Sequence, residues 1–70
     1  MEERNSLAKR IKKLRKTRGL TQKQFEVVSG IPYSTLAKIE AGVIANPSIP
    51  TLKKLSKGLK ITLDKLLEDV

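Results

Sequence analysis

The chain has 70 residues, with no cysteine or histidine, and its 15 Lys and Arg residues against seven Asp and Glu leave a net charge of +8. These absences exclude a disulfide, a thiolate metal site and the commonest general base, so we expect no enzyme, metal site or cofactor, and the charge favours a polyanionic partner. Because the chain lacks a run of eighteen apolar residues and a signal-peptide core, we expect a cytoplasmic protein without membrane contact.

The first predicted helix covers residues 5–18. Leu7, Ile11 and Leu14 recur at helical spacing and form one apolar stripe, and a glycine follows as a C-terminal stop. Eight basic residues and no acidic one lie between Arg4 and Arg18. For any single lysine among them, two interpretations carry equal weight: it attracts phosphate, or it only solvates the helix.

Two short helices over residues 22–29 and 32–41 are predicted on either side of one tight turn. Thr21, with a glutamine three residues later, forms a capping box at the start of the first. Gly30 ends that helix at low cost with a positive φ, and the fixed φ of Pro32 suits the first turn of the next. The apolar residues expected to lock the pair together are Phe25, Val28, Ile31, Leu36 and Ile39.

Two further helices are predicted over residues 49–58 and 62–69, with Ser48 and Thr62 as their N-caps. The apolar face of the fourth helix is expected to comprise Ile49, Leu52, Leu55 and Leu59. No strand pattern is present in the sequence. The predicted architecture is therefore all-α, a compact five-helix bundle that forms one domain over residues 1–70.

The stretch over residues 21–42 resembles the helix-turn-helix of the Cro and phage-repressor type, the XRE-like family. The Gly-Leu-Thr-Gln motif of that family stands at residues 19–22, its Ser-Gly turn at 29–30 and its Ile-Glu-x-Gly end at 39–42. The match continues into both flanking segments and covers nearly the whole chain. The resemblance implies a lambda-repressor-like fold and a sequence-specific regulator that binds double-stranded DNA with its third helix in the major groove.

The resemblance also assigns contacts and one ion pair to individual residues. The base-reading residues it implies are Tyr33, Ser34, Ala37 and Lys38. The phosphate contacts it implies are Gln22, Asn46 and Ser48. We expect further phosphate contacts from Lys23 and Arg10, because of their charge, and from Thr21 and Thr35. Two alternatives stay open: Tyr33 contacts the DNA backbone or only packs across the turn, and Asn46 with Ser48 forms only a turn and cap. Arg15 and Glu40 fall where the family often has an ion pair between the first and third helices.

Three positions depart from the family pattern. Glu26 replaces a small alanine between the second and third helices, so its carboxylate must turn to solvent or find a cationic partner. Gly58 and Lys60 look exchanged relative to the usual Ala and Gly, which predicts either a left-handed Lys60 or an earlier helix end. Residues 43–45 are apolar, and they either pack under the fourth helix or form part of a partner surface.

The leading interpretation is a repressor that binds a pseudo-palindromic operator as a homodimer. The fifth helix supplies a candidate dimer interface, or alternatively the end of the monomer core, through Leu63, Leu66, Leu67 and Val70. A competing interpretation is an antitoxin-type interaction module. Such a module would neutralise a toxin or another protein partner and bind DNA only secondarily.

Overall fold

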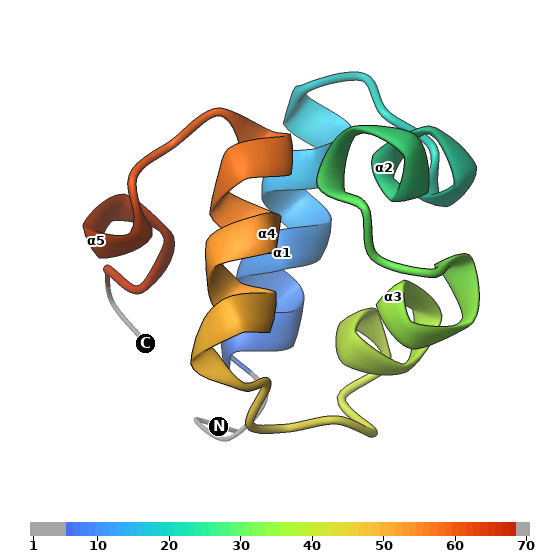
Figure 1. Cartoon of the computed structure of the whole chain (residues 1–70). Coiled ribbons are helices and arrows are strands. Elements are labelled where there is room, and N and C mark those ends of the chain that lie inside the picture. The colour runs from blue at the N-terminus through green and yellow to red at the C-terminus, as the bar shows by residue number, and fades with distance from the viewer. Residues whose placement is uncertain (1–5, 69–70) are drawn as a thin grey trace.

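A computed structural model describes residues 6–68, which form five helices and no strand (Figure 1). The helices are α1 (Ser6–Thr17), α2 (Gln22–Ser29), α3 (Tyr33–Glu40), α4 (Ile49–Leu59) and α5 (Leu63–Leu66). The all-α, five-helix prediction is confirmed. The first four helices agree with their predicted bounds to within one residue at each end, whereas α5 is shorter than expected.

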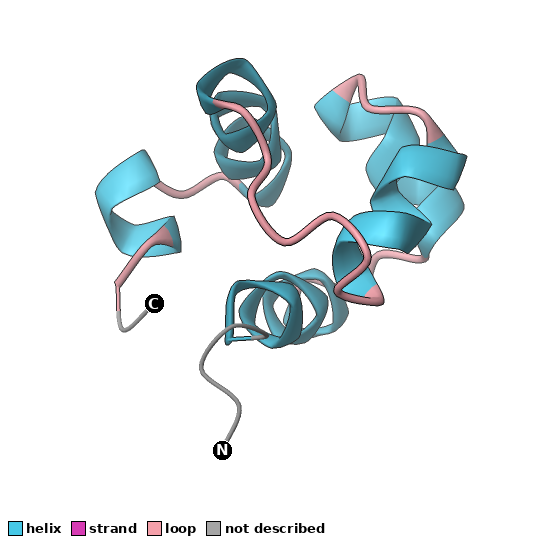
Figure 2. Ribbon diagram, turned by 90° about the horizontal axis from the view of Figure 1, so that it is seen from below, coloured by secondary structure: helices cyan, strands magenta, loops and turns pink. Residues whose placement is uncertain are grey.

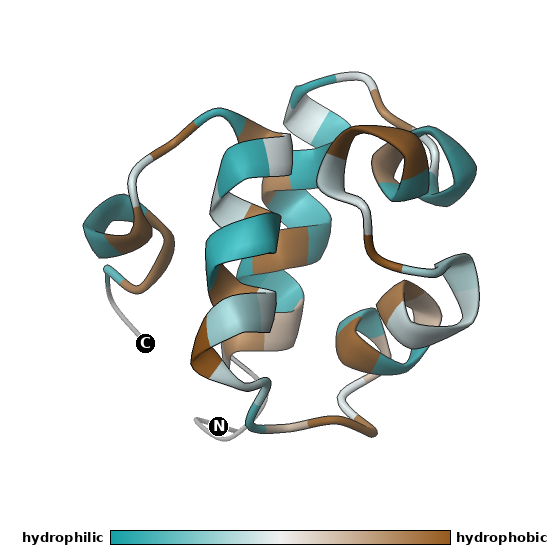
Figure 3. Cartoon of the chain, viewed as in Figure 1, coloured by the Kyte–Doolittle hydropathy of each residue, from teal (hydrophilic) through white to brown (hydrophobic). Residues whose placement is uncertain are grey.

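The helices are arranged around α1 and α4, which contact each other. The α2–α3 pair lies on one side of them and α5 on the other, in both views of the molecule (Figures 1 and 2). The core comprises Leu7, Ile11, Phe25, Ile31, Leu36, Ile39, Leu52, Leu55, Leu59 and Leu66. Apolar and polar segments alternate along the helices, as expected for helices that each bury one stripe (Figure 3). Within residues 6–68, no helix combines the length and apolar character needed to cross a bilayer.

Two residues predicted to be buried lie at the surface instead. Val28 is 44% exposed, because the buried face of α2 is centred on Phe25 and Ser29 and leaves Val28 at its edge. Ile49 is 56% exposed, because it is the first residue of α4 and the helix turns its apolar face inward only from Leu52 onward.

The predicted helix caps are present. The Gln24 amide donates to Thr21 Oγ1 at 3.1 Å and the Thr21 amide donates to Gln24 Oε1 at 2.8 Å, which completes the capping box. Ser48 and Thr62 each accept from the amide three residues later, at 3.4 and 3.1 Å. Gly30 ends α2 with φ 78°. The short turn between α2 and α3 thus begins at a glycine in the left-handed conformation.

The exchange of glycine and lysine at the end of α4 has a packing reason. Lys60 adopts φ 60° and ψ 43°, and it is the only non-glycine residue with positive φ among residues 6–68. This left-handed conformation was one of the two predicted outcomes, and it costs about 1 kcal/mol. Gly58 is required where it stands, because a Cβ atom there would lie 2.8 Å from Phe25 Cε1 and 2.9 Å from Ser29 Cβ. The glycine lets α4 approach α2 closely.

The leucines of α5 belong to the core rather than to a free surface. Leu66 has no exposed area, so it cannot form a dimer contact and is removed from the candidate interface. Leu63 and Leu67 are half-buried and pack against the same cluster. Val70 lies outside the described residues. The burial of these leucines agrees with the alternative that they complete the core of the monomer.

Candidate nucleic-acid interface

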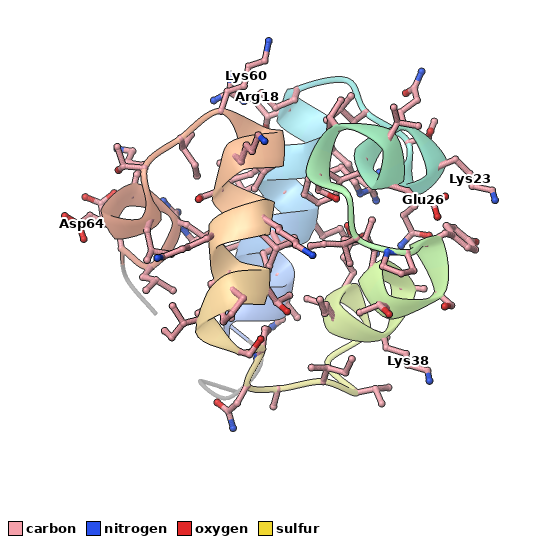
Figure 4. The ribbon with its side chains drawn as sticks, viewed as in Figure 1. Arg18, Lys23, Glu26, Lys38, Lys60 and Asp64 are labelled. Atoms are coloured by element: carbon pink, nitrogen blue, oxygen red, sulfur yellow. The ribbon has the colours of Figure 1, made fainter. Side chains whose placement is uncertain are left out.

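The outer face of α3 carries the side chains expected to read bases. Tyr33, Ser34 and Lys38 are exposed and Ala37 is half-buried. They share one side of the helix, while Leu36 and Ile39 on the opposite side are buried in the core. Lys38 points away from the body of the protein (Figure 4). The fold therefore presents these side chains together on a helix whose back is anchored.

Glu26 caps the start of α3. Pro32, the N-cap residue, makes no side-chain hydrogen bond to the helix. Instead, Glu26 Oε2 accepts from the Tyr33 amide at 3.1 Å, across the turn from α2 (Figure 4). A carboxylate at this point satisfies an orphan donor and interacts favourably with the positive end of the helix. The expectation that Glu26 faces solvent or a cation is thus replaced by a contact with backbone.

A second residue of α2 contacts the same tyrosine through its ring. Lys23 Nζ lies 4.8 Å from the centroid of the Tyr33 ring, which is within cation–π range. Glu26 and Lys23 are three residues apart on α2, so one face of this helix holds both the amide and the ring of Tyr33. Tyr33 as a whole residue remains 40% exposed. Tyr33 packs across the turn, which was one of the alternatives predicted for it, and part of its surface remains accessible.

The predicted ion pair between Arg15 and Glu40 is present and nearly inaccessible to solvent. Arg15 Nε donates to Glu40 Oε2 at 2.7 Å, and Nη2 donates to Oε1 at 3.0 Å. The remaining nitrogen, Nη1, donates to the Leu20 carbonyl at 2.6 Å. Gln22 Nε2 donates to Glu40 Oε1 at 3.1 Å. This network joins α1, the start of α2 and the end of α3, so it fixes the orientation of the candidate reading helix.

The network changes the role of the side chain expected to be a leading phosphate contact. The side-chain amide nitrogen of Gln22 donates to Glu40. A phosphate at the start of α2 would therefore depend in part on the backbone N–H groups of the first helical turn, which have no partner within the helix. Thr21 uses its hydroxyl in the capping box, and Ser48 uses its hydroxyl as a cap and in a 3.0 Å contact with Thr51 Oγ1. Asn46 is exposed.

Arg10 is placed away from the candidate interface. Its Nε donates to the Leu66 carbonyl at 3.0 Å and its Nη2 to the Lys65 carbonyl at 2.7 Å, with a Glu68 carboxylate oxygen 3.7 Å from Nη2. These groups belong to α5 and the residue two positions after it, on the opposite side of α1 and α4 from α2 and α3 (Figures 1 and 2). The expectation that Arg10 contacts a phosphate is therefore wrong. Arg10 links α1 to α5 instead.

Only one residue of the apolar loop after α3 packs under α4. Ile44 is half-buried and packs against the core, as expected for a residue under α4. Val43 is 71% exposed and Ala45 is also exposed. The loop thus anchors itself by one side chain and leaves the other two at the surface.

Comparison with known proteins places this geometry in a family. Residues 11–66 match the helix-turn-helix family model. The transcriptional regulator SlrR of Bacillus subtilis is 43% identical over 58 residues, which are 83% of this chain and 38% of that protein. The regulator SinR of the same organism is 33% identical over 63 residues, which are 90% of this chain and 57% of that protein. The chain thus spans from 38% to 57% of these relatives.

Solved structures agree with this assignment. The crystal structure of SinR, described as the master regulator for biofilm formation, in complex with DNA superposes with a TM-score of 0.83 at 34% identity, covering 89% of this chain and 98% of that chain. A SinR–SinI complex gives a TM-score of 0.82, also at 34% identity, over 89% of this chain and 60% of that chain. Because the family model covers most of the sequence, this chain belongs to the helix-turn-helix family of the Cro and phage-repressor type.

Proposed function

We propose that the chain is a sequence-specific double-stranded DNA-binding unit of a transcriptional regulator, with α3 in the major groove. The observation that carries the proposal is the solvent-facing side of α3, on a helix fixed by the core, by the Glu26 cap and by the Arg15–Glu40 pair. The relatives are named as transcriptional regulators, and one structural neighbour is a complex with DNA. These names also agree with the expectation that the chain is not an enzyme.

The proposed base contacts follow from the groups that α3 presents. Lys38 donates to a guanine edge, Ser34 donates or accepts, and the Ala37 methyl contacts a thymine methyl. Tyr33 lies at the N-terminal end of the helix, where its half-exposed ring and hydroxyl reach either a base edge or the adjacent phosphate. The net charge of +8 supplies the nonspecific attraction to the duplex.

The proposed phosphate contacts surround α3. They comprise the first-turn amides and side chain of Gln22, together with Lys23, Thr21, Thr35, Asn46 and Ser48. Arg10 is not included, because its guanidinium is bound to α5. These groups set the position of the protein on the duplex, and they carry little sequence information.

We propose further that the unit acts as a repressor and binds its operator as a homodimer, since paired recognition helices one helical turn apart read pseudo-palindromic sites. One relative, RghR of Bacillus subtilis, is named a transcriptional repressor; it is 34% identical over 89% of this chain and 46% of that protein. Binding to cellular DNA agrees with the expected cytoplasmic location. The antitoxin interpretation is set aside, because the relatives are named as regulators of transcription.

The proposal is tested by selecting bound sequences from a random duplex pool. We expect a pseudo-palindrome that binds ~10³-fold or more above scrambled DNA, with both affinities measured at about 50 and about 200 mM salt. Equal affinity for all sequences that vanishes at the higher salt would leave only nonspecific charge attraction and would remove the proposed readout.

A further inference from the structure

A hollow of about 330 Å³ lies where α2 and the C-terminal ends of α1 and α4 meet. Its lining residues are Arg18, Leu20, Val28, Gly58 and Lys60. Leu20 and Val28 give it an apolar wall, while Arg18 and Lys60 are exposed cations at its rim. Figure 4 shows these two cations at the same end of the molecule. The hollow thus combines apolar surface with positive charge.

The two cations are not neutralised within the described part of the chain. Among residues 6–68, the ion pairs of Lys and Arg involve Arg10, Arg15 and Lys65, and neither Arg18 nor Lys60. Since like charges at one rim reinforce each other, the hollow attracts anions. Its complement is a group that carries negative charge beside an apolar body.

Two features of the hollow are unfavourable in the isolated protein. Lys60 has a left-handed backbone that a glycine would adopt without strain. Val28 exposes an apolar side chain on a helix face that a polar residue could occupy. An apolar group that covers Val28 removes its exposed surface from water, and the strained Lys60 places a cation at the rim where a glycine would cost less; functional sites often hold such strain and such exposed apolar groups.

We propose that the hollow binds a segment of another protein that presents one apolar side chain flanked by carboxylates. A phosphate backbone would satisfy the cations but would leave Leu20 and Val28 uncovered, so the apolar wall favours a protein segment over nucleic acid. Lys38 on α3 and Lys60 at the hollow lie far apart in Figure 4, which lets the protein segment and DNA bind at the same time. This inference goes beyond the proposed DNA binding and does not rest on it.

The test is a titration of the ¹⁵N-labelled full chain followed by amide chemical shifts. The probe is the capped peptide Asp-Glu-Leu-Glu-Asp, with capped Asn-Gln-Leu-Gln-Asn and Asp-Glu-Gly-Glu-Asp as the uncharged and the non-apolar controls. We expect the first peptide to shift the amides of Leu20, Val28 and Lys60 most strongly. Each control peptide is expected to bind roughly fivefold or more weakly, since it lacks one of the two complementary features.

Matched variants separate binding from folding. Lys60→Gly removes one cation and also the backbone strain, so it folds at least as well, and we expect it to weaken binding of the acidic peptide roughly two- to fivefold. Val28→Ala is expected to weaken binding, whereas Val27→Ala, at a neighbouring residue that is 82% exposed and outside the hollow, leaves it unchanged.

Three results would overturn the proposal. The first is no preference of the acidic leucine peptide over its controls, and the second is unchanged binding in Lys60→Gly. The third is a shift of the hollow's amides by a scrambled DNA duplex but not by the peptide, which would make Arg18 and Lys60 phosphate contacts instead.

Discussion

Gly58 of α4 is predicted not to tolerate an added methyl group, that is, its substitution by alanine. A Cβ atom at this position would approach Phe25 Cε1 to 2.8 Å, Ser29 Cβ to 2.9 Å and Ser29 Cα to 3.1 Å. Carbon atoms that are not bonded prefer about 3.5–4.0 Å, so the overlap approaches an ångström. Phe25 is fully buried and Ser29 nearly so, and neither can move aside without displacing α2.

The expected magnitude follows from two opposing terms. Overpacking costs about 1–3 kcal/mol, and approaches below 3 Å to two buried side chains put Gly58 in the upper part of that range, at about 2–3 kcal/mol, while alanine gains about 1 kcal/mol over glycine inside a helix. We therefore expect Gly58→Ala to lower the free energy of unfolding by about 1–2 kcal/mol. Lys60→Gly relieves a left-handed backbone but frees the unfolded chain, so we expect it to raise that free energy by about 0.5–1 kcal/mol.

Urea and thermal unfolding followed by circular dichroism measure both changes. For a domain of this size, 1 kcal/mol shifts Tm by about 4–8 °C, so Gly58→Ala should lose at least about 4 °C and Lys60→Gly should gain a few degrees. Gly58→Ser serves as a second small substitution and should be at least as damaging as alanine. A Gly58→Ala protein as stable as the parent would refute the close approach of α4 to α2.

Three further predictions concern α3 and the residues around it. In a double-mutant cycle, Arg15→Ala or Glu40→Ala alone is expected to cost about 3 kcal/mol of unfolding free energy, and the double variant less than the sum; additive losses would exclude coupling. Glu26→Ala is expected to lose a cap worth about 1 kcal/mol and to speed hydrogen exchange of the Tyr33 amide. Glu26→Gln retains an acceptor and should keep most of the protection, so equal exchange in all three proteins would contradict the cap. Lys23→Ala should weaken binding of operator and scrambled duplexes alike and reduce the salt slope by about 1; a loss confined to the operator would contradict a phosphate role.

Much of the fold followed from local signals in the sequence. The capping box at Thr21, the glycine at the end of α2 and the N-caps at Ser48 and Thr62 fixed helix ends to within one residue in most cases, because each depends on neighbours a few positions away. The displaced glycine left two outcomes open at the end of α4, and the structure shows the left-handed Lys60. The α5 helix was predicted too long, since a leucine pattern continues to Leu67, whereas only the Leu67 amide makes a helical bond, to the Leu63 carbonyl at 3.0 Å, and the Glu68 amide donates to Lys65 in a turn.

What the sequence did not predict depends on contacts between distant segments. The capping of α3 by Glu26 requires a side chain of α2 to reach across the turn, and the family pattern places an alanine there. Arg10 was assigned to phosphate from its charge, whereas its partners are carbonyl groups more than fifty residues away. Val28 has helical spacing from Phe25 but falls at the edge of the buried face. Charge and periodicity do not determine such pairings.

The central claim is that α3 reads base pairs in the major groove, and single base-pair substitutions in the selected operator test it most directly. Affinities of the parent, Lys38→Ala and Lys23→Ala proteins would be measured for every substitution. The account predicts that Lys38→Ala loses about 1–3 kcal/mol of discrimination at one position of each half-site and leaves the other positions unchanged, while Lys23→Ala lowers all affinities together. A uniform loss for Lys38→Ala across all operators would contradict base reading by α3.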